Sequence, residues 1–252
     1  MLRVQILGPV RAWRGDNELD LGPIRQRAIF ALLALAGGQP LPRAEMIDVL
    51  WNDRPPPAAI NVIQTHVKRL RRVLEPERAA RAPSHVLVSS GNGYAFNVPP
   101  DRVDLMRFRG LVAEARRAQE AEAFGSAVTL YLEALRLWQR EALSGISILA
   151  NHPDVVALRG ERQAVLAHLT DVAIATGAAV DAVPILEQDA AAQPLDEAAQ
   201  ARLIRVYHAA GQRARAIARY EAVRDRLAAE LGVDPGRHLA SARAALLAGP
   251  TT

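Results

Sequence analysis

The clearest pattern of hydrophobic and polar positions in this chain lies between residues 55 and 74. Hydrophobic residues recur there at steps of three or four, which is the spacing of one buried stripe on an α-helix. The members of this stripe are Ile60, Ile63, Val67, Leu70 and Leu74. The spacing therefore predicts a helix from about Ala58 to Leu74 with one face packed against a core.

The opposite face of this predicted helix is polar and mainly basic. Its members are Asn61, Thr65, Lys68, Arg69 and Arg72, with Gln64 and Arg71 at its flanks. Arginine and lysine pair with phosphate or guanine, and asparagine and glutamine pair with adenine. A charged helix face is usually only a solvated surface. The helix alone therefore leaves DNA recognition and simple solvation open, and it leaves His66 either facing DNA or packed at the helix margin.

Two helices and a hairpin are predicted on either side of this helix. Arg25 to Ala36 and Pro42 to Trp51 are apolar segments upstream, each long enough for about three turns. Downstream, Val86 to Ser89 and Tyr94 to Val98 are β-prone runs joined by Ser90-Gly91-Asn92-Gly93. The Asn-Gly pair in this connection supplies the positive φ angles of a tight hairpin. The order of helix, helix, basic helix and hairpin predicts a winged helix-turn-helix.

The first 22 residues predict a small β-sheet in front of the helices. Three short β-prone runs occur there: Val4 to Ile6, Val10 to Trp13 and Glu18 to Leu21. The residues between them, Gly8-Pro9 and Gly15-Asp16-Asn17, are typical of turns. An α+β domain of about 100 residues is therefore predicted, with a strand-rich start.

The pattern changes at Pro99-Pro100 from a period of two to a helical period of 3.6. This change predicts two domains, residues 1–100 and residues 101–252. Seven helices are predicted in the second domain, from about Leu105 to Ala121, Phe124 to Trp138, Asp154 to Thr176, Val180 to Gln193, Glu197 to Ala210, Arg213 to Leu231 and Pro235 to Leu247.

Similar residues recur in the second domain at a spacing of 34, which is the tetratricopeptide period. The pairs are Leu169 and Leu203, Ala173 and Tyr207, Ala182 and Ala216, and Leu186 and Tyr220. A divergent earlier copy passes through Leu111, Ala118, Ala127, Tyr131 and Ala134, before an insertion of about 21 residues. Alanine richness also produces such matches by chance. We expect an all-α, tetratricopeptide-like domain that binds protein surfaces and carries no chemistry.

Charge is divided unequally between the two predicted domains. Residues 1–100 contain 13 Lys and Arg against 8 Asp and Glu, whereas residues 101–252 contain 18 against 19. The excess positive charge therefore accompanies the basic helix, as binding to a polyanion requires. The overall pI of 10.1 is weaker support. Lys68 is the only lysine, and a GC-rich genome also produces such an arginine bias.

Enzymatic and metal chemistry are not indicated. The six histidines include no pair at the four-residue spacing of a helical metal site, and no phosphate-binding loop or Gly-x-Ser-x-Gly turn occurs. The absence of cysteine excludes disulfides and thiolate metal sites. No secretory leader or apolar span of ~20 residues is present. We expect a cytoplasmic protein that is not an enzyme and needs no cofactor or metal.

These elements resemble the OmpR-type winged helix and, more closely, the antibiotic regulatory proteins of actinobacteria known as the SARP family. The matching stretches, in order, are RVQILGPVRAW, RQRAIFALLALA, MIDVLW, PPPAA, QTHVKRLRRVL and GNGYAF. From about Asp104 to Leu247 the chain is similar to the bacterial transcriptional activation domain of that family, with ELGVDPGRHL near its end. The resemblance is to the small type of member, which has no receiver or ATPase module.

The resemblance implies a transcriptional activator that binds direct repeats in promoters of antibiotic and other secondary-metabolite gene clusters. Its implied partners are double-stranded DNA, RNA polymerase with its sigma factor, and a second copy of the chain at least on DNA. The helix from about Ala58 to Leu74 would enter the major groove and the wing would touch the adjacent minor groove or backbone. The expected DNA-binding residues are Asn61, Gln64, Thr65, Lys68, Arg69, Arg71, Arg72, Ser90, Asn92, Gly93 and Tyr94.

The proline-rich loop before the basic helix is a candidate contact with RNA polymerase. By the same resemblance, Asp53 and Arg54 are the contacting residues, although the loop equally suits a rigid cap on the helix. Two other functions stay open. The first is a protein-interaction adaptor with a degenerate winged helix, and the cluster of Lys68 and its arginine neighbours argues against it. The second is a repressor with the same DNA-binding chemistry.

Overall fold

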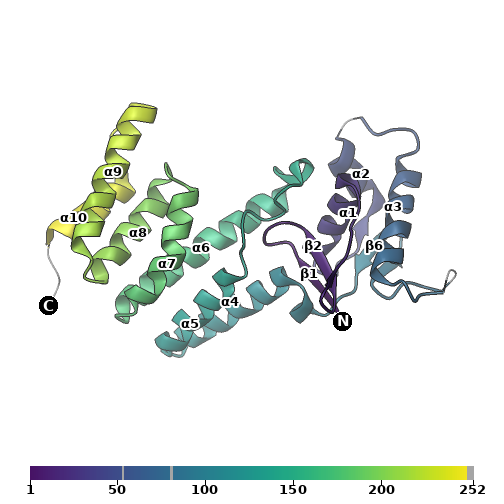
Figure 1. The fold of residues 1–252 in the computed structure, drawn as a ribbon, viewed down its shortest axis with the longest axis horizontal. Coiled ribbons are helices and arrows are strands. Elements are labelled where there is room, and N and C mark those ends of the chain that lie inside the picture. Colours follow the sequence, from purple (N-terminus) through teal and green to yellow (C-terminus); the bar gives the residue numbers. More distant parts are fainter. Residues whose placement is uncertain (53, 80–81, 249–252) are drawn as a thin grey trace. The chain divides into compact units, whose positions relative to one another are not determined.

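The structure is a computed structural model that describes residues 1–52, 54–79 and 82–248 (Figure 1). By their internal contacts the residues divide into two compact units. The first consists of residues 1–110 and 137–161, and the second of residues 111–136 and 162–252. These units do not coincide with the predicted domains, because the first unit also takes in residues 101–110 and Leu137–Glu161.

A three-stranded antiparallel sheet opens the first unit. Strand β1 (Leu2–Gln5) pairs with β2 (Arg11–Arg14), and β2 pairs with β3 (Asn17–Glu18). The predicted sheet is confirmed, but its third strand is shorter than expected. The chain leaves the sheet after Glu18, and Leu21 is instead buried, with 4% of its surface exposed.

Three helices form the body of the first unit: α1 (Ile24–Leu35), α2 (Arg43–Trp51) and α3 (Ala59–Leu74). Helix α1 is central, since it contacts α2, α3 and the wing strand β6 (Gly93–Phe96). Every residue from Ala28 to Leu35 is buried, which explains why this segment shows no polar face. Phe30 of α1 meets Phe96 of β6 edge to face, with ring centroids 5.4 Å apart.

The wing is a three-stranded sheet rather than a hairpin alone. Strands β5 (Leu87–Ser90) and β6 form the predicted hairpin, and the short β4 (Leu41–Pro42) adds to the other side of β6, giving the order β4-β6-β5. Strand β4 has only two residues, one of them a proline, so it shows no alternating pattern. The turn also differs from expectation, because the positive φ angle (+53°) is at Gly91 rather than in the Asn92-Gly93 pair.

A distant segment completes the first unit. Residues 137–161 include the 3-10 helix η2 (Ser147–Leu149), and they contain most of the insertion that the repeat spacing predicted. The segment bonds to the backbone beyond β1 through N–H groups that donate to carbonyls, in the pairs Gln139 to Leu7, Leu143 to Ile6 and Ser144 to Gly8. Its Trp138 packs edge to face on Phe108, with ring centroids 5.5 Å apart.

The side chain of Asp104 also binds the backbone just after β1. It follows the 3-10 helix η1 (Pro100–Arg102), and its carboxylate accepts N–H bonds of 2.8–2.9 Å from Ile6, Leu7 and Leu105. Burial raises the pKa of Asp104 to about 6, against the opposing effect of these N–H donors. The end of β1 and the first turn of the following helix are thus joined through one buried carboxyl group.

The helices beyond η1 match the predicted ones within two residues at each end. They are α4 (Asp104–Glu120), α5 (Phe124–Arg136), α6 (Pro153–Ala175), α7 (Ala179–Ala192), α8 (Glu197–Ala209), α9 (Arg213–Leu231) and α10 (Arg237–Ala248). In the second unit α8 packs against α7, α9 and α10. All eight residues of the predicted pairs are buried. This burial is what a tetratricopeptide-like array requires, because each unit covers its apolar face only against its neighbours.

The second unit also contains a buried charge cluster centred on Asp189 of α7. The Asp189 side chain is 1% exposed, and its carboxylate lies 3.0 Å from Arg202 of α8 and 3.7 Å from Arg162 of α6. The side-chain amide of Gln193 donates to the same carboxylate at 3.0 Å. The charge of Asp189 is therefore neutralised inside the helical packing.

Within the part of the chain that the structure describes, no helix is long and apolar enough to cross a membrane.

Candidate nucleic-acid interface

Helix α3 has one buried face and one exposed face, as its sequence predicts. The buried residues are Ala59, Ile63, Val67, Leu70 and Leu74, and α1 and α2 pack against the helix. The prediction for Ile60 was wrong, since 51% of this residue is exposed. Ala59 takes the buried position of the first turn, four residues before Ile63, so Ile60 is rotated to the edge of the stripe.

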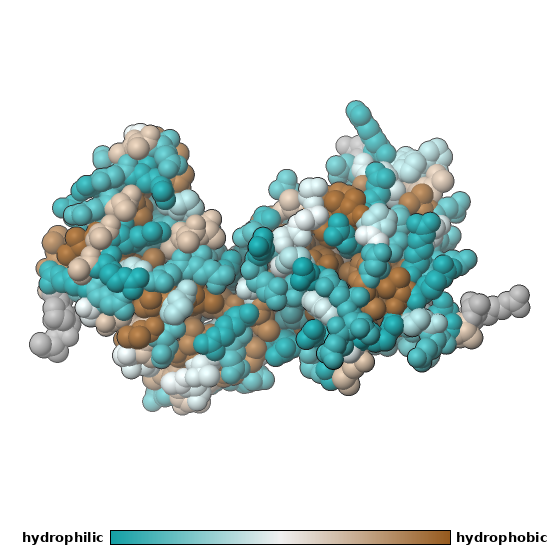
Figure 2. Space-filling view, in the orientation of Figure 1, coloured by the Kyte–Doolittle hydropathy of each residue, from teal (hydrophilic) through white to brown (hydrophobic). Residues whose placement is uncertain are grey.

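The exposed face of α3 carries the polar residues that the sequence analysis selected. Asn61, Gln64, Thr65, Lys68, Arg69 and Arg72 are all exposed. Across the described residues, no carboxylate forms an ion pair with any of the three cations of this face. The surface over α3 is largely hydrophilic in Figure 2. This face therefore offers uncompensated positive charge beside amide and hydroxyl groups, a combination that suits a polyanion with readable edges.

Arg71 lies at the flank of this face and is partly buried. Its Nε and Nη2 donate to the carbonyl of Leu87 at 2.9 and 2.7 Å, and Nη2 also donates to the hydroxyl of Ser89 at 2.9 Å. The guanidinium lies 5.5 Å from the centre of the Tyr94 ring. Burial lowers the pKa of Arg71. Arg71 was predicted among the DNA-binding residues, whereas in the structure its donors bind the wing.

His66 packs at the margin of α3. Its Nδ1 is 3.2 Å from the side-chain oxygen of Gln26, a buried residue of α1. Burial lowers the pKa of His66, and the nearby charges of Arg69 and Arg25 lower it further. A neutral imidazole that donates from Nδ1 to Gln26 fits this contact. The structure thus supports the packing alternative for His66.

The predicted wing residues fall into two groups. Asn92 is exposed at the tip and Ser90 is half-buried beside it. Gly93 and Tyr94 are buried, and a Cβ atom at Gly93 would lie 2.1 Å from the carbonyl oxygen of Leu41 in β4. Gly93 is therefore required for the close approach of β4 and β6. Among the predicted wing residues, Ser90 and Asn92 are therefore accessible at the turn, whereas Gly93 and Tyr94 are buried in the sheet.

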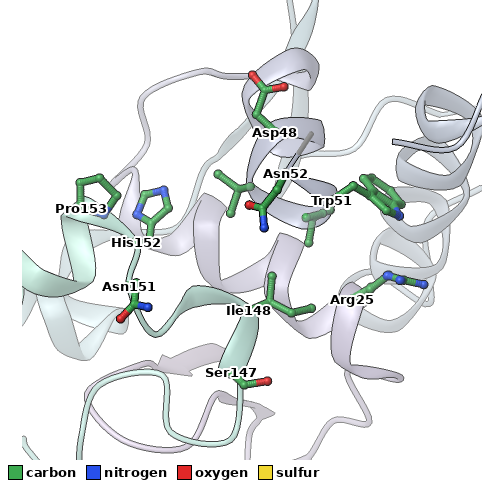
Figure 3. Close-up of a pocket in the computed structure, with 11 residues that line it drawn as sticks. Arg25, Asp48, Trp51, Asn52, Ser147, Ile148, Asn151, His152 and Pro153 are labelled. Atoms are coloured by element: carbon green, nitrogen blue, oxygen red, sulfur yellow. The ribbon is translucent and has the colours of Figure 1, made fainter. Parts of the chain in front are cut away.

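The loop between α2 and α3 borders a cleft of about 740 Å³ within the first unit (Figure 3). Trp51 and Asn52 line one side of it, and Asn151 and His152 of the distant segment line another. Arg54 is exposed near the start of the loop, whereas Asp53 lies outside the described residues. Sequence reasoning missed this cleft because its walls are about 100 positions apart in the chain.

Comparison with known protein families divides the chain in two. Residues 103–247 match the bacterial transcriptional activator domain, and residues 16–96 match the C-terminal domain of transcriptional regulatory proteins. These ranges contain the helical array and the winged helix, respectively. Both matches agree with the architecture described above.

Individual relatives are also regulators. The chain is 37% identical over 235 residues to the regulatory protein AfsR of Streptomyces coelicolor, covering 93% of this chain and 23% of AfsR. It is 28% identical to the regulatory protein DnrI of Streptomyces peucetius, covering 98% of this chain and 92% of DnrI. A solved structure of Mycobacterium tuberculosis EmbR in complex with a low-affinity phosphopeptide is similar with a TM-score of 0.78 and 27% identity. That match covers 100% of this chain and 66% of the EmbR chain. The chain thus spans about a quarter of the length of AfsR.

Proposed function

The chain belongs to the SARP family of bacterial transcriptional regulators, and from that membership we propose that it is a sequence-specific, DNA-binding transcriptional activator. The observation that carries the proposal is the exposed face of α3, where Lys68, Arg69 and Arg72 have no acidic partner among the described residues. A winged helix places such a face in the major groove of DNA. The family is one of regulators rather than enzymes.

The exposed residues of α3 and the wing have different roles in DNA recognition. Lys68, Arg69 and Arg72 bind phosphates, because they lie toward the C-terminal half of α3 and form no ion pair with a carboxylate in the described ranges. Asn61 and Thr65 contact base edges, since the N-terminal part of a recognition helix approaches the bases most closely. The hydroxyl of Thr65 donates to the carbonyl of Asn61 at 2.8 Å, which leaves its oxygen free to accept a bond. Gln64 lies beside them, and Ser90 and Asn92 contact the neighbouring backbone.

The proposed setting is a promoter with direct repeats, at a secondary-metabolite gene cluster. Two copies of the chain bind half-sites about one helical turn, ~10 to 11 base pairs, apart. Support comes from the family, and from AfsR and DnrI, which are named regulatory proteins. Each copy recruits RNA polymerase with its sigma factor, and the exposed Arg54 with its neighbour Asp53 is the proposed contact.

Selection of binding sites from randomised duplex DNA tests the DNA-binding proposal. We expect enrichment of a direct repeat, with an affinity that falls steeply as salt rises because phosphate contacts release counterions. Lys68 offers a second readout as the only lysine. The selected duplex should protect its amine from acetylation, measured by mass spectrometry. No enriched sequence would refute the proposal and favour the adaptor function. A selected duplex that leaves Lys68 unprotected would refute the contact of this residue with DNA.

In vitro transcription separates activation from binding. Arg54→Ala should leave DNA affinity unchanged and lower transcript yield several-fold, since one contact with polymerase contributes on the order of 1 kcal/mol. Arg213→Ala, an exposed arginine at the start of α9, is the matched control and should change neither quantity. A protein that lowers transcription from its own site would instead be a repressor.

A further inference from the structure

We propose that Arg71 is a positioning residue, which holds the wing in place relative to the recognition helix, and not a DNA-contacting residue. The inference rests on the proposed function, because it concerns how the same surface meets DNA. Of the four clustered basic residues of α3, Arg71 thus orients the wing, while the other three face the proposed DNA site.

Arg71 binds the outer edge of the wing sheet. In the order β4-β6-β5, strand β5 has no neighbouring strand on its outer side among the described residues, so its outward carbonyls need other partners. Leu87 lies opposite Phe96 in the β5–β6 register, and its carbonyl accepts two N–H bonds from Arg71. At this point Arg71 of α3 therefore supplies the donors that a neighbouring strand would supply.

The Arg71 guanidinium contacts three groups of the wing. Two nitrogens bind the Leu87 carbonyl, one of them also binds the Ser89 hydroxyl, and the plane lies near the ring of Tyr94 on β6. Turning Arg71 toward DNA would break all of these contacts and leave a carbonyl of β5 without its partner. Lysine cannot replace this arrangement, because a single ammonium lacks the planar pair of donors.

The position of the wing tip depends on this attachment. Asn92 stands only three residues beyond Ser89, at the end of a two-residue turn. Arg72, the next residue in the chain, is exposed and has no comparable contact among the described residues. The two neighbouring arginines thus provide a matched pair in which the same substitution tests two different roles.

The experiment measures affinity of the full chain for its selected DNA site with Arg71→Lys and Arg72→Lys. Lysine keeps the charge, so it should rescue a phosphate contact at residue 72 to within about threefold. At residue 71 it should fail, with a loss of about tenfold or more, as expected when a charge-assisted hydrogen bond is broken. Thermal unfolding of each variant establishes that it is folded, and Ser89→Ala, which removes one bond only, should give a smaller loss in the same direction.

A double-mutant cycle with Asn92→Ala gives the readout that general destabilisation does not move. We expect Asn92→Ala to weaken binding in the parent chain but to add little in the Arg71→Lys background, while its effect persists in the Arg72→Lys background. Rescue by lysine at residue 71, or an undiminished effect of Asn92→Ala there, would overturn the role of Arg71 alone. Failure of the parent chain to bind any duplex would overturn the proposed function and this role together.

Discussion

On α3 three cations are exposed without an acidic partner among the described residues, whereas on α8 of the second unit the arginines are matched to carboxylates. Arg205 lies 2.8 Å from Asp171, and Arg202 lies 3.0 Å from Asp189. Helix α3 contains three arginines and a lysine in 16 residues, and α8 contains two arginines in 13. The difference shows that the number of basic residues says little about binding to a polyanion, and that the pairing of each charge within the fold decides which surface keeps a positive field.

The largest effect is expected from the buried member of this comparison. Asp189→Ala leaves Arg202 and Arg162 without the carboxylate they approach inside the helical packing. Removing one partner of a buried ion pair costs roughly 3 to 5 kcal/mol. Chemical denaturation should show this loss in the free energy of unfolding. Asp171→Ala, which removes an exposed carboxylate from Arg205, should cost at most about 1 kcal/mol. Equal losses would contradict the distinction between the two pairs.

Asp104 is a second buried carboxylate, and it differs from Asp189 because backbone N–H groups rather than arginines bind it. Its pKa is raised from 3.8 to about 6, so between these pH values the folded state binds more protons than the unfolded state. Its contribution should therefore make the chain less stable as pH rises from about 4 to 6, by about 3 kcal/mol, and then level off.

Denaturation at a series of pH values checks the contribution of Asp104. Asp104→Asn should remove this part of the pH dependence, although it also disturbs the N–H bonds and lowers stability overall. Asp101→Asn, an exposed carboxylate three residues earlier, is the control and should leave the pH dependence as it is. Identical slopes for the parent and the Asp104 variant would show that this carboxyl group does not titrate as described.

A smaller effect is expected from the unpaired arginine of α3. Arg72→Ala should weaken binding to the selected DNA site about tenfold and reduce the salt slope by about 1, since one phosphate contact is lost. Its fold should be unchanged because the side chain is exposed. Arg205→Ala, the exposed and paired arginine of α8, should leave both measurements unaltered. An effect of the same size at both positions would remove the distinction between paired and unpaired charge.

The smallest effect is expected at Ile60. Because 51% of this residue is exposed, Ile60→Ala should change the free energy of unfolding by no more than about 0.5 kcal/mol. Ile63→Ala, three residues later in the fully buried stripe, should cost roughly 2 to 5 kcal/mol. Thermal or chemical unfolding measures both. A large loss at Ile60 would mean that the rotation of α3 in the structure is incorrect.

Most helices were predictable to within two residues because they repeat a burial pattern over several turns, whereas α1 was predictable from the length of its apolar segment. The buried stripe of α3 from Ile63 to Leu74 follows directly from such a pattern. The end of α9 follows instead from Gly232, whose positive φ angle (+68°) closes the helix. Ile60 was placed wrongly because one turn at a helix start gives too few positions to choose between it and Ala59. Strand β4 was missed for a similar reason, since two residues contain no period.

The family, the order of elements and the residues of the basic face follow from the sequence, because they depend on local periodicity and on residue types. Which charges are paired depends instead on the tertiary structure. Arg71 and Arg72 are neighbours with the same chemistry, yet one binds the edge of β5 and the other is exposed. Likewise, Leu137–Glu161 contributes to the first unit through backbone N–H and carbonyl groups, which every residue except proline provides. Contacts between distant parts of a chain depend on how its surfaces meet, and a local pattern does not contain that information.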